Sequence, residues 1–234
     1  MILRKCMMTQ STCYKQTNRG LKHIGIVVHS TGANNPYINR YVQPSEDDPE
    51  YPFILSDLGK NKYGNDWNHK DRQAGVHAFI GKNQYGVVET YQVMPYDFAA
   101  WGVGKGKHGS YNFAPLSHIQ FEICEDDLKD EGYFYTVMRE AQEYCAKLCY
   151  LYKFDPHKAI CSHAEAAKLG YASTHGDPDH WLEKYGKSMD WFREEVETML
   201  YTDYPYVCYD PNDKIVGFFA TVEEANSKIG CRVV

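Results

Sequence analysis

The chain has 234 residues, of which 43% are hydrophobic and 24% are charged, enough for one sizeable domain with its own core. A formal net charge of −6 argues against a nucleic-acid binder, which normally carries a basic face. No apolar run is long enough to span a membrane, so we expect a globular protein that binds neither nucleic acid nor membranes.

The cysteines and the first residues indicate where the chain is made. No CxxC pair occurs, and eight cysteines in a chain of this length do not suggest a disulfide framework, so we expect reduced thiols. Residues 1–13 lack the long apolar core of a secretory signal. We therefore expect synthesis in the cytoplasm without a signal peptide.

The first 93 residues alternate apolar runs with polar segments. A short helix is expected over 9–17, and the continuous β-branched run 24–28 is typical of a central buried strand. Residues 37–72 form a long polar insertion in which we expect helix only in pieces, and which could form one wall of a groove. Residues 75–81 and 86–93 predict two strands joined by a turn.

The middle of the chain combines a glycine-rich loop with clear periodic patterns. Residues 99–112 predict a loop that approaches another part of the protein closely. Residues 117–124 alternate apolar and polar side chains, which predicts a half-buried strand with Glu122 on its polar face. Apolar spacing and strand propensity predict a helix over 133–154, a short strand over 158–162 and a second helix over 188–201.

The pattern changes after Tyr201. A hairpin (206–209 and 214–220, with a turn at 211–213), a capping box at 221–224 and a last strand at 231–234 are expected. The fold class is therefore α/β, with a central mixed β-sheet flanked by helices and a small C-terminal α+β appendage. We assign residues 1–201 to the main domain and 202–234 to the appendage, which is either a binding segment or a linker.

Imidazole and carboxylate groups are concentrated in residues 162–181. Both groups are good zinc ligands, and a catalytic zinc takes three protein ligands and one water. The segment can supply two ligands, for instance His163 and Asp177, and His29 at the end of the first apolar strand is the best third donor. Any one of these histidines alone is more often a satisfied surface or core residue, but the group together favours a metal site.

Four segments in this order resemble the zinc amidases of the N-acetylmuramoyl-L-alanine amidase type 2 family, whose fold is shared with peptidoglycan recognition proteins. They are IVVHSTGANNP (26–36), VHAFIGKNQYGVVETYQ (76–92), AWGVGKGKHGSYNFAPLSHIQFEICE (100–125) and SHAEAAKLGYASTHGDPDHW (162–181). The resemblance covers roughly residues 9–200 and is greatest to endolysins of phages and prophages of clostridia and related Firmicutes. It implies hydrolysis of the amide between the lactyl group of N-acetylmuramic acid and L-alanine in peptidoglycan.

The resemblance also implies roles for individual residues. His29, His163 and Asp177 match the family's Zn²⁺ ligands, and Glu122 matches the acidic residue that acts as general base in many members. His175 departs from the family, because many relatives have a lysine there that stabilises the oxyanion. An imidazole can donate the same hydrogen bond only when its donor nitrogen faces the substrate.

Other polar or aromatic residues have less specific roles. His77 falls where some relatives place a tyrosine near the metal, and Trp101 can line the groove, so both are expected to bind substrate. His118 shares a strand face with Glu122 and is either a support for the metal site or a rival ligand. Cys161, two residues before His163, raises the alternative of a thiol hydrolase, although a cysteine inside a strand beside its own histidine has poor geometry for that.

The sequence thus favours a monomeric zinc amidase of the endolysin or autolysin type, whose partner is bacterial peptidoglycan. Such an enzyme would reach the cell wall only after release, for example through a phage holin or by lysis. The alternatives are a peptidoglycan-binding module without hydrolysis and an amidase that acts on soluble muropeptides. The complete ligand set with Glu122 favours an enzyme, since pure binders commonly lose a ligand.

Overall fold

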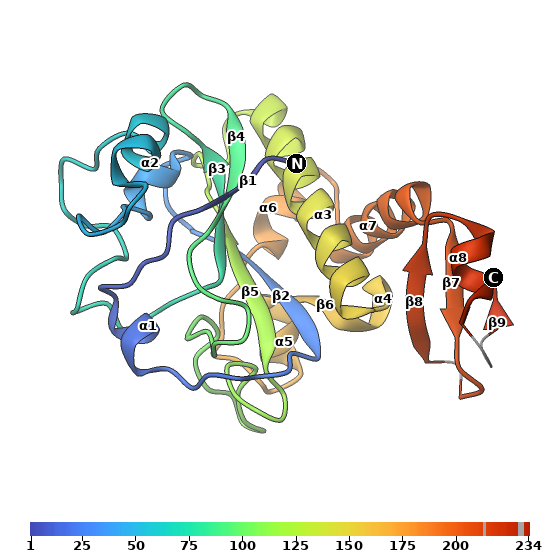
Figure 1. Cartoon of the computed structure of the whole chain (residues 1–234). Helices are drawn as coiled ribbons and strands as arrows, with labels where there is room; N and C mark the ends of the chain where they lie inside the picture. Colours follow the sequence, from blue (N-terminus) through green and yellow to red (C-terminus); the bar gives the residue numbers. More distant parts are fainter. Residues whose placement is uncertain (213, 229–231) are drawn as a thin grey trace.

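The computed structural model describes residues 1–212, 214–228 and 232–234, and within them a six-stranded mixed sheet forms the centre (Figure 1). The strand order is β1-β4-β3-β5-β2-β6. The strands are β1 (Leu3–Lys5), β2 (Gly25–Ser30), β3 (Ala78–Lys82), β4 (Val88–Gln92), β5 (His118–Ile123) and β6 (Ile160–Ser162). β3 and β4 pair antiparallel and the other neighbours pair parallel, so the predicted mixed sheet is confirmed.

Two long helices cover one face of the sheet. α3 (Glu131–Tyr152) and α7 (Met189–Asp203) lie side by side on it, as Figure 1 shows. Val28 of β2 and Phe121 of β5 pack against this layer in the main hydrophobic core. Because side chains alternate along a strand, the residues that follow them in sequence, His29 and Glu122, point to the opposite face.

The insertion 37–72 lies against this opposite face. It contains η1 (Ile38–Arg40) and α2 (Tyr51–Leu58), which confirms that helix occurs there only in pieces. Tyr41 stacks on Phe79 of β3 with ring centroids 5.5 Å apart, and Trp67 meets the same ring edge-on at 5.0 Å. Aromatic packing therefore fixes the insertion to the face of the sheet that carries Glu122.

The prediction that β5 is half-buried was wrong, because all six of its residues are buried. The glycine-rich loop 99–112 covers its polar side so closely that a Cβ added at Gly102 would overlap Oε1 of Gln120. A covering of this kind brings together segments far apart in the sequence, so strand periodicity cannot reveal it. The predicted close approach of the loop is confirmed.

Four short helices complete the main body: α1 (Thr12–Gln16), α4 (Pro156–Ala159), α5 (His163–Lys168) and α6 (Asp179–Lys184). The helix expected over 9–17 is shorter because Ser11 caps its start, accepting a hydrogen bond from the backbone N–H of Tyr14. The strand expected from residue 158 begins at Ile160, since the residues before it form α4. Among the helices of the described residues, none has the length and apolarity needed to cross a membrane.

The C-terminal segment forms a separate small sheet beyond α7, with strand order β8-β7-β9 (Figure 1). Its elements are β7 (Tyr206–Tyr209), β8 (Ile215–Phe219), α8 (Val222–Asn226) and β9 (Arg232–Val233). The predicted hairpin is confirmed, and Thr221 caps α8 by accepting from the backbone N–H of Glu224. Asp213 of the predicted turn and Cys231 of the predicted last strand lie outside the described residues.

Candidate metal centre

Three side chains converge at the carboxyl-terminal end of β2. Nδ1 of His29 lies 3.1 Å from Nδ1 of His163 and 3.3 Å from Oδ2 of Asp177, and Nδ1 of His163 lies 3.4 Å from Oδ1 of Asp177. Three ligands of one tetrahedral zinc ion are separated by about 3.3 Å, given zinc–ligand bonds of about 2.0–2.2 Å. These three residues, which the sequence singled out as ligands, therefore form a set that fits a zinc ion.

The charges within this group agree with a cation site. Burial alone would raise the pKa of Asp177, but hydrogen bonds with His163 and His29 outweigh burial and hold the pKa of the carboxyl well below its usual range. Burial lowers the pKa of His29, which favours its neutral form. A carboxylate and a neutral imidazole are the forms in which these side chains bind metals.

His163 owes its position to a helix start. β6 pairs with β2 in parallel register, with Ser162 opposite Val28, and His163 is the first residue of α5. Ser162 and Glu165 form a reciprocal capping box that fixes this turn. The buried guanidinium of Arg193 on α7 holds Glu165 through two hydrogen bonds of 2.9 and 3.0 Å. The ligand is therefore rigidly anchored to the core.

Asp177 lies in the loop between α5 and α6, and three contacts hold this part of the chain against β2, α5 and the segment that follows β5. The backbone N–H of Ser30 donates to Oδ2 of Asp177 (3.4 Å), and the N–H of Ala164 donates to its carbonyl (3.2 Å). His180 contacts the buried Glu125 through Nε2, at 3.1 Å. His180 thus holds the ligand loop in place and is not one of the converging ligands.

Glu122 lies beside the three ligands. It is paired with His29 in the β2–β5 register, so the two side chains share one face of the sheet. Its Oε2 is buried and lacks a hydrogen-bond partner among the described residues. Burial raises the pKa of Glu122 well above its usual value, and the charges of Asp177 and Glu125 add to that effect. A carboxylate in these surroundings readily takes up a proton.

His175 stacks on His163 with ring centroids 4.5 Å apart and is exposed on its other side. The hydroxyl of Ser173 donates its only proton to the carbonyl of Val103 (3.0 Å), so it must accept from Nδ1–H of His175 (3.1 Å). In neutral His175 the free Nε2 is therefore an acceptor. The expected donor role at an oxyanion requires the imidazolium form.

With this geometry established, comparison with known proteins identifies the family. The model of the N-acetylmuramoyl-L-alanine amidase family (Amidase_2) matches residues 19–180, which include all three candidate ligands. The chain belongs to this family. None of the curated protein sequences matches it.

Solved structures show the same fold. The Staphylococcus aureus hydrolase AmiA, solved with its ligand, shares 21% identity, with a TM-score of 0.52 over 86% of this chain and 82% of that one. The PlyG catalytic domain shares 19%, with a TM-score of 0.53 over 86% and 96%. A mutant endolysin from Bacillus subtilis shares 18%, with a TM-score of 0.55 over 84% and 99%. At these identities the likeness establishes the amidase fold.

In this amidase-family chain, the structure contradicts the substrate role expected for His77 and one of the two alternatives for His118. His77 is fully buried, its Nε2 bonded to the carbonyl of Phe98 and its Nδ1 to the backbone N–H of Gln120, so its ring serves the core and not a substrate. His118 is not a rival ligand, since it stacks on Tyr111 at 3.9 Å and bonds the carbonyl of Leu116. Sequence position cannot reveal that backbone groups form hydrogen bonds with the ring nitrogens of His77 and His118.

The structure also shows what surrounds Trp101 and Cys161. Trp101 lines a hollow of about 610 Å³ with Lys105 and Phe113, and its buried Nε1 has no hydrogen-bond partner in the described part of the chain. A substrate role for Trp101 therefore stays a prediction. Burial raises the pKa of the Cys161 thiol to about 12, so little reactive thiolate forms and the thiol-hydrolase alternative loses its nucleophile.

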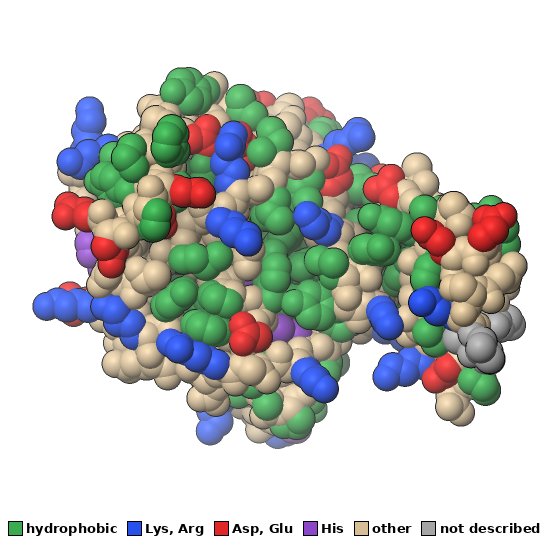
Figure 2. Space-filling model, viewed as in Figure 1, with side chains coloured by type: hydrophobic (Ala, Val, Ile, Leu, Met, Phe, Trp, Pro, Cys, Tyr) green, Lys and Arg blue, Asp and Glu red, His purple; other side chains and the backbone are tan. Residues whose placement is uncertain are grey.

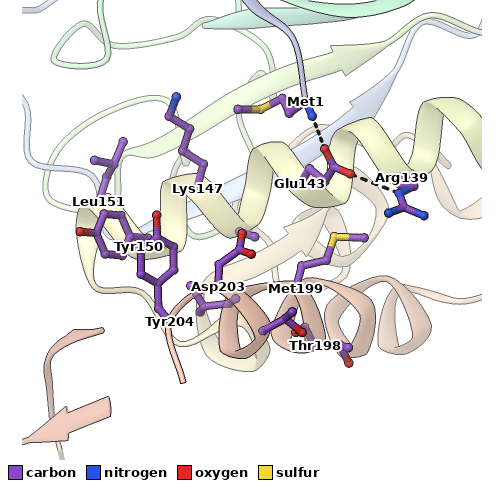
Figure 3. A pocket seen from close by; sticks show the side chains of 13 residues that line it. Met1, Arg139, Glu143, Lys147, Tyr150, Leu151, Thr198, Met199, Asp203 and Tyr204 are labelled. Atoms are coloured by element: carbon purple, nitrogen blue, oxygen red, sulfur yellow. Dashed lines mark hydrogen bonds and ion pairs between the residues drawn. The ribbon is translucent and has the colours of Figure 1, made fainter. Parts of the chain in front are cut away.

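A separate cavity of about 630 Å³ lies between α3 and α7, and none of the candidate ligands lines it (Figure 3). Its labelled side chains include Arg139, Glu143 and Asp203, so it carries both signs of charge. Cavity volume is therefore a poor guide to the candidate metal centre in this fold.

Sequence reasoning missed three residues near the centre. Glu125 holds the loop of Asp177 through its contact with His180. Gln120 on β5 is the diagonal neighbour of His29 on β2. The guanidinium of Arg72, in the insertion, lies 4.1 Å from the centre of the Trp67 ring and lowers the pKa of Glu122, against the larger effect of burial. Alternation along β5 could have indicated Gln120, which shares a face with Glu122.

Proposed function

We propose that this chain is a zinc-dependent N-acetylmuramoyl-L-alanine amidase, which hydrolyses the amide between the lactyl group of N-acetylmuramic acid and L-alanine in peptidoglycan. The observation that carries the proposal is the triangle of two Nδ1 atoms and one carboxylate, with Glu122 buried beside it. Membership of the amidase family supports the substrate class.

His29, His163 and Asp177 would hold the zinc ion. When bound, zinc supplies a Lewis acid that polarises the scissile carbonyl and lowers the pKa of water. Glu122 acts as general base: it takes a proton from the attacking water and passes it to the nitrogen of the departing L-alanine. Its raised pKa suits this task, because the protonated form persists until the amine leaves.

His175 and Trp101 would contact the substrate. Imidazolium His175 donates from Nε2 to the oxygen of the scissile carbonyl, while Ser173 holds the ring through Nδ1. Loss of one such donor costs about 100- to 1000-fold in rate. Trp101, which lines the hollow with Lys105 and Phe113, offers an aromatic face to the glycan or the stem peptide.

We further propose that the enzyme lyses cell walls as an endolysin or autolysin, with residues 1–201 as the catalytic domain and residues 202–234 as a wall-directed appendage or linker. The family match, which ends at residue 180, supports a catalytic unit distinct from the C-terminal sheet. The relation to clostridial phages and the monomeric state stay predictions from the sequence.

The test is an assay on purified peptidoglycan with and without a chelator, measuring new N-terminal alanine and new reducing ends. We expect chelator-sensitive release of alanine amines without reducing ends. Asp177→Ala should abolish both zinc binding and release, whereas Asp203→Ala, at the distant α3–α7 cavity, should change neither. Binding to the sacculi without any release would reject the enzyme and support a recognition module.

A further inference from the structure

Several buried polar atoms near the candidate metal centre lack hydrogen-bond partners of normal length among the described residues, and Nε2 of His29 and Oε1 of Gln120 are two of them. In the parallel β2–β5 register, Gln120 pairs with Val27 and Glu122 pairs with His29. Gln120 and His29 are therefore diagonal neighbours on one face of the sheet. Both are almost completely inaccessible to solvent, so an unpaired N–H or carbonyl there is costly.

The orientation of the Gln120 amide follows from its other contacts. Its Nε2 donates to Oδ1 of Asn112 (3.0 Å) and to the carbonyl of Tyr111 (3.4 Å). Oδ1 of Asn112 also accepts from the backbone N–H of Val103 (3.2 Å), which fixes the Asn112 amide in turn. A flipped Gln120 amide would lose both donor contacts, so Oε1 is the end that faces the remaining space.

The side chain of Gln120 offers the ring of His29 a hydrogen-bond acceptor across the β2–β5 pair. Gly102 packs on Oε1 so tightly that a Cβ there would overlap it, which leaves no room for a bridging water on that side. The ring N–H of His29 is thus the donor within reach of this carbonyl.

We propose that Gln120 is a positioning residue for His29: its Oε1 accepts from Nε2–H and so keeps the lone pair of His29 on Nδ1, available to the zinc ion that His163 and Asp177 would hold with it. This inference rests on the proposed metal centre and deepens it. Histidines that bind metals almost always donate their other ring N–H to an acceptor, and loss of that acceptor typically costs about 10- to 100-fold in metal affinity. Gln120 would in turn be held by Asn112 of the glycine-rich loop.

The test compares Gln120→Met, which nearly keeps the shape but removes the acceptor, with Gln120→Glu. A protonated glutamate restores both the acceptor for His29 and a donor for Asn112. The control is Gln142→Met, a buried glutamine on α3. Zinc affinity is measured by competition with a chromophoric chelator, and thermal unfolding of the metal-free proteins is measured in parallel.

We expect Gln120→Met to weaken zinc binding about 10- to 100-fold, Gln120→Glu to recover most of that loss, and Gln142→Met to bind zinc like the wild type. Equal zinc affinity of folded Gln120→Met and wild type would overturn the proposal. Recovery of zinc affinity in Gln120→Glu separates the acceptor role from a merely structural one. Methionine and glutamate fill similar space, and they differ in whether they offer His29 an acceptor.

A second measurement uses only the wild-type protein and remains decisive if Gln120→Met does not fold. In the zinc-loaded wild type, the ¹H chemical shift of the Nε2–H proton of His29 reports whether this group is hydrogen-bonded. A downfield shift typical of a hydrogen-bonded imidazole N–H is expected, and a shift typical of an unbonded N–H would overturn the proposal. Failure of the proposed function looks different: the wild type would then bind no zinc or release no alanine amine.

Discussion

At the scale of single residues, the chemistry of the candidate centre depends on which ring nitrogen of each histidine carries the proton. A zinc ion held by Nδ1 of His29 and of His163 would need the lone pairs of those atoms, so the protons of both rings would then belong on Nε2. His175 has the opposite arrangement, since Ser173 accepts from its Nδ1. The surroundings of each ring thus separate the two candidate ligands from the histidine proposed to face the substrate, although all three are the same residue type.

Glu122→Gln tests the general base. Glutamine keeps the shape and polarity of the side chain but cannot take a proton, so zinc binding should be retained while turnover falls by about 100-fold or more. The metal-free variant should be at least as stable as wild type at neutral pH, because an ionised carboxylate is no longer buried. Zinc titration and alanine-amine release measure the two effects, and near wild-type turnover would remove Glu122 from its role.

The core histidines predict a pH dependence of stability. Burial lowers the pKa of His77 to about 3 and that of His118 to about 4, from 6.5 in the unfolded chain. The folded state therefore binds fewer protons between pH 6.5 and 4, and stability that is fully present above pH 6.5 is lost as the pH falls. Each histidine contributes about 1.4 kcal/mol per pH unit within that window.

His118→Gln checks this dependence. Urea unfolding at pH 7 and pH 5, with a chelator present, should show a smaller acid-induced loss of unfolding free energy in the variant than in the wild type. His108→Gln, at an exposed histidine, should keep the wild-type loss. Identical losses in His118→Gln and wild type would contradict the prediction.

At the scale of elements, two loops that are distant in sequence position the candidate catalytic groups jointly. The backbone N–H of His108 donates to Gly170 (2.7 Å), and that of Ser173 donates to Val103 (2.8 Å). These bonds join the glycine-rich loop to the segment that leads into His175 and Asp177. The loop needs glycine because its backbone touches another backbone directly.

Gly106→Ala tests this contact. A Cβ at Gly106 would overlap the carbonyl of Gly170 and lie 2.8 Å from the backbone nitrogen of Ala172, so one loop must move. Overpacking of this kind typically costs about 1–3 kcal/mol of unfolding free energy, which urea unfolding measures. Gly132→Ala, at the start of α3, meets only the side chain of Asp130 and should be neutral or slightly stabilising. Equal effects of the two substitutions would disprove the proposed contact.

At the scale of the whole molecule, the charge distribution gives no general attraction to an anionic cell wall. On the face shown in Figure 2, lysine and arginine side chains are scattered among aspartate and glutamate and do not gather into one basic area. With a net charge of −6, binding to a wall polymer would need specific contacts. The C-terminal sheet, set beside the main body in the same view, is one place for them.

Truncation after Asp203 tests the division of the chain. The amidase unit should stay folded, bind zinc and release alanine amines, because the candidate ligands and Glu122 lie before α7. Thermal stability should fall somewhat, since Val207 and Phe218 pack into the core that α7 shares. Loss of folding, judged by circular dichroism, would show that residues 204–234 belong to one cooperative unit with the rest.

The sequence by itself determined the elements and the candidate ligands, because the apolar period of a strand or helix and the ligand chemistry of histidine and aspartate are local properties. It predicted β2, α3 and α7 and singled out His29, His163 and Asp177. Only the tertiary structure decided that β5 is covered on both faces, that the ring of His77 is used by the core, and that Gln120 lies beside His29. These features depend on contacts between segments far apart in the chain, which no local pattern encodes.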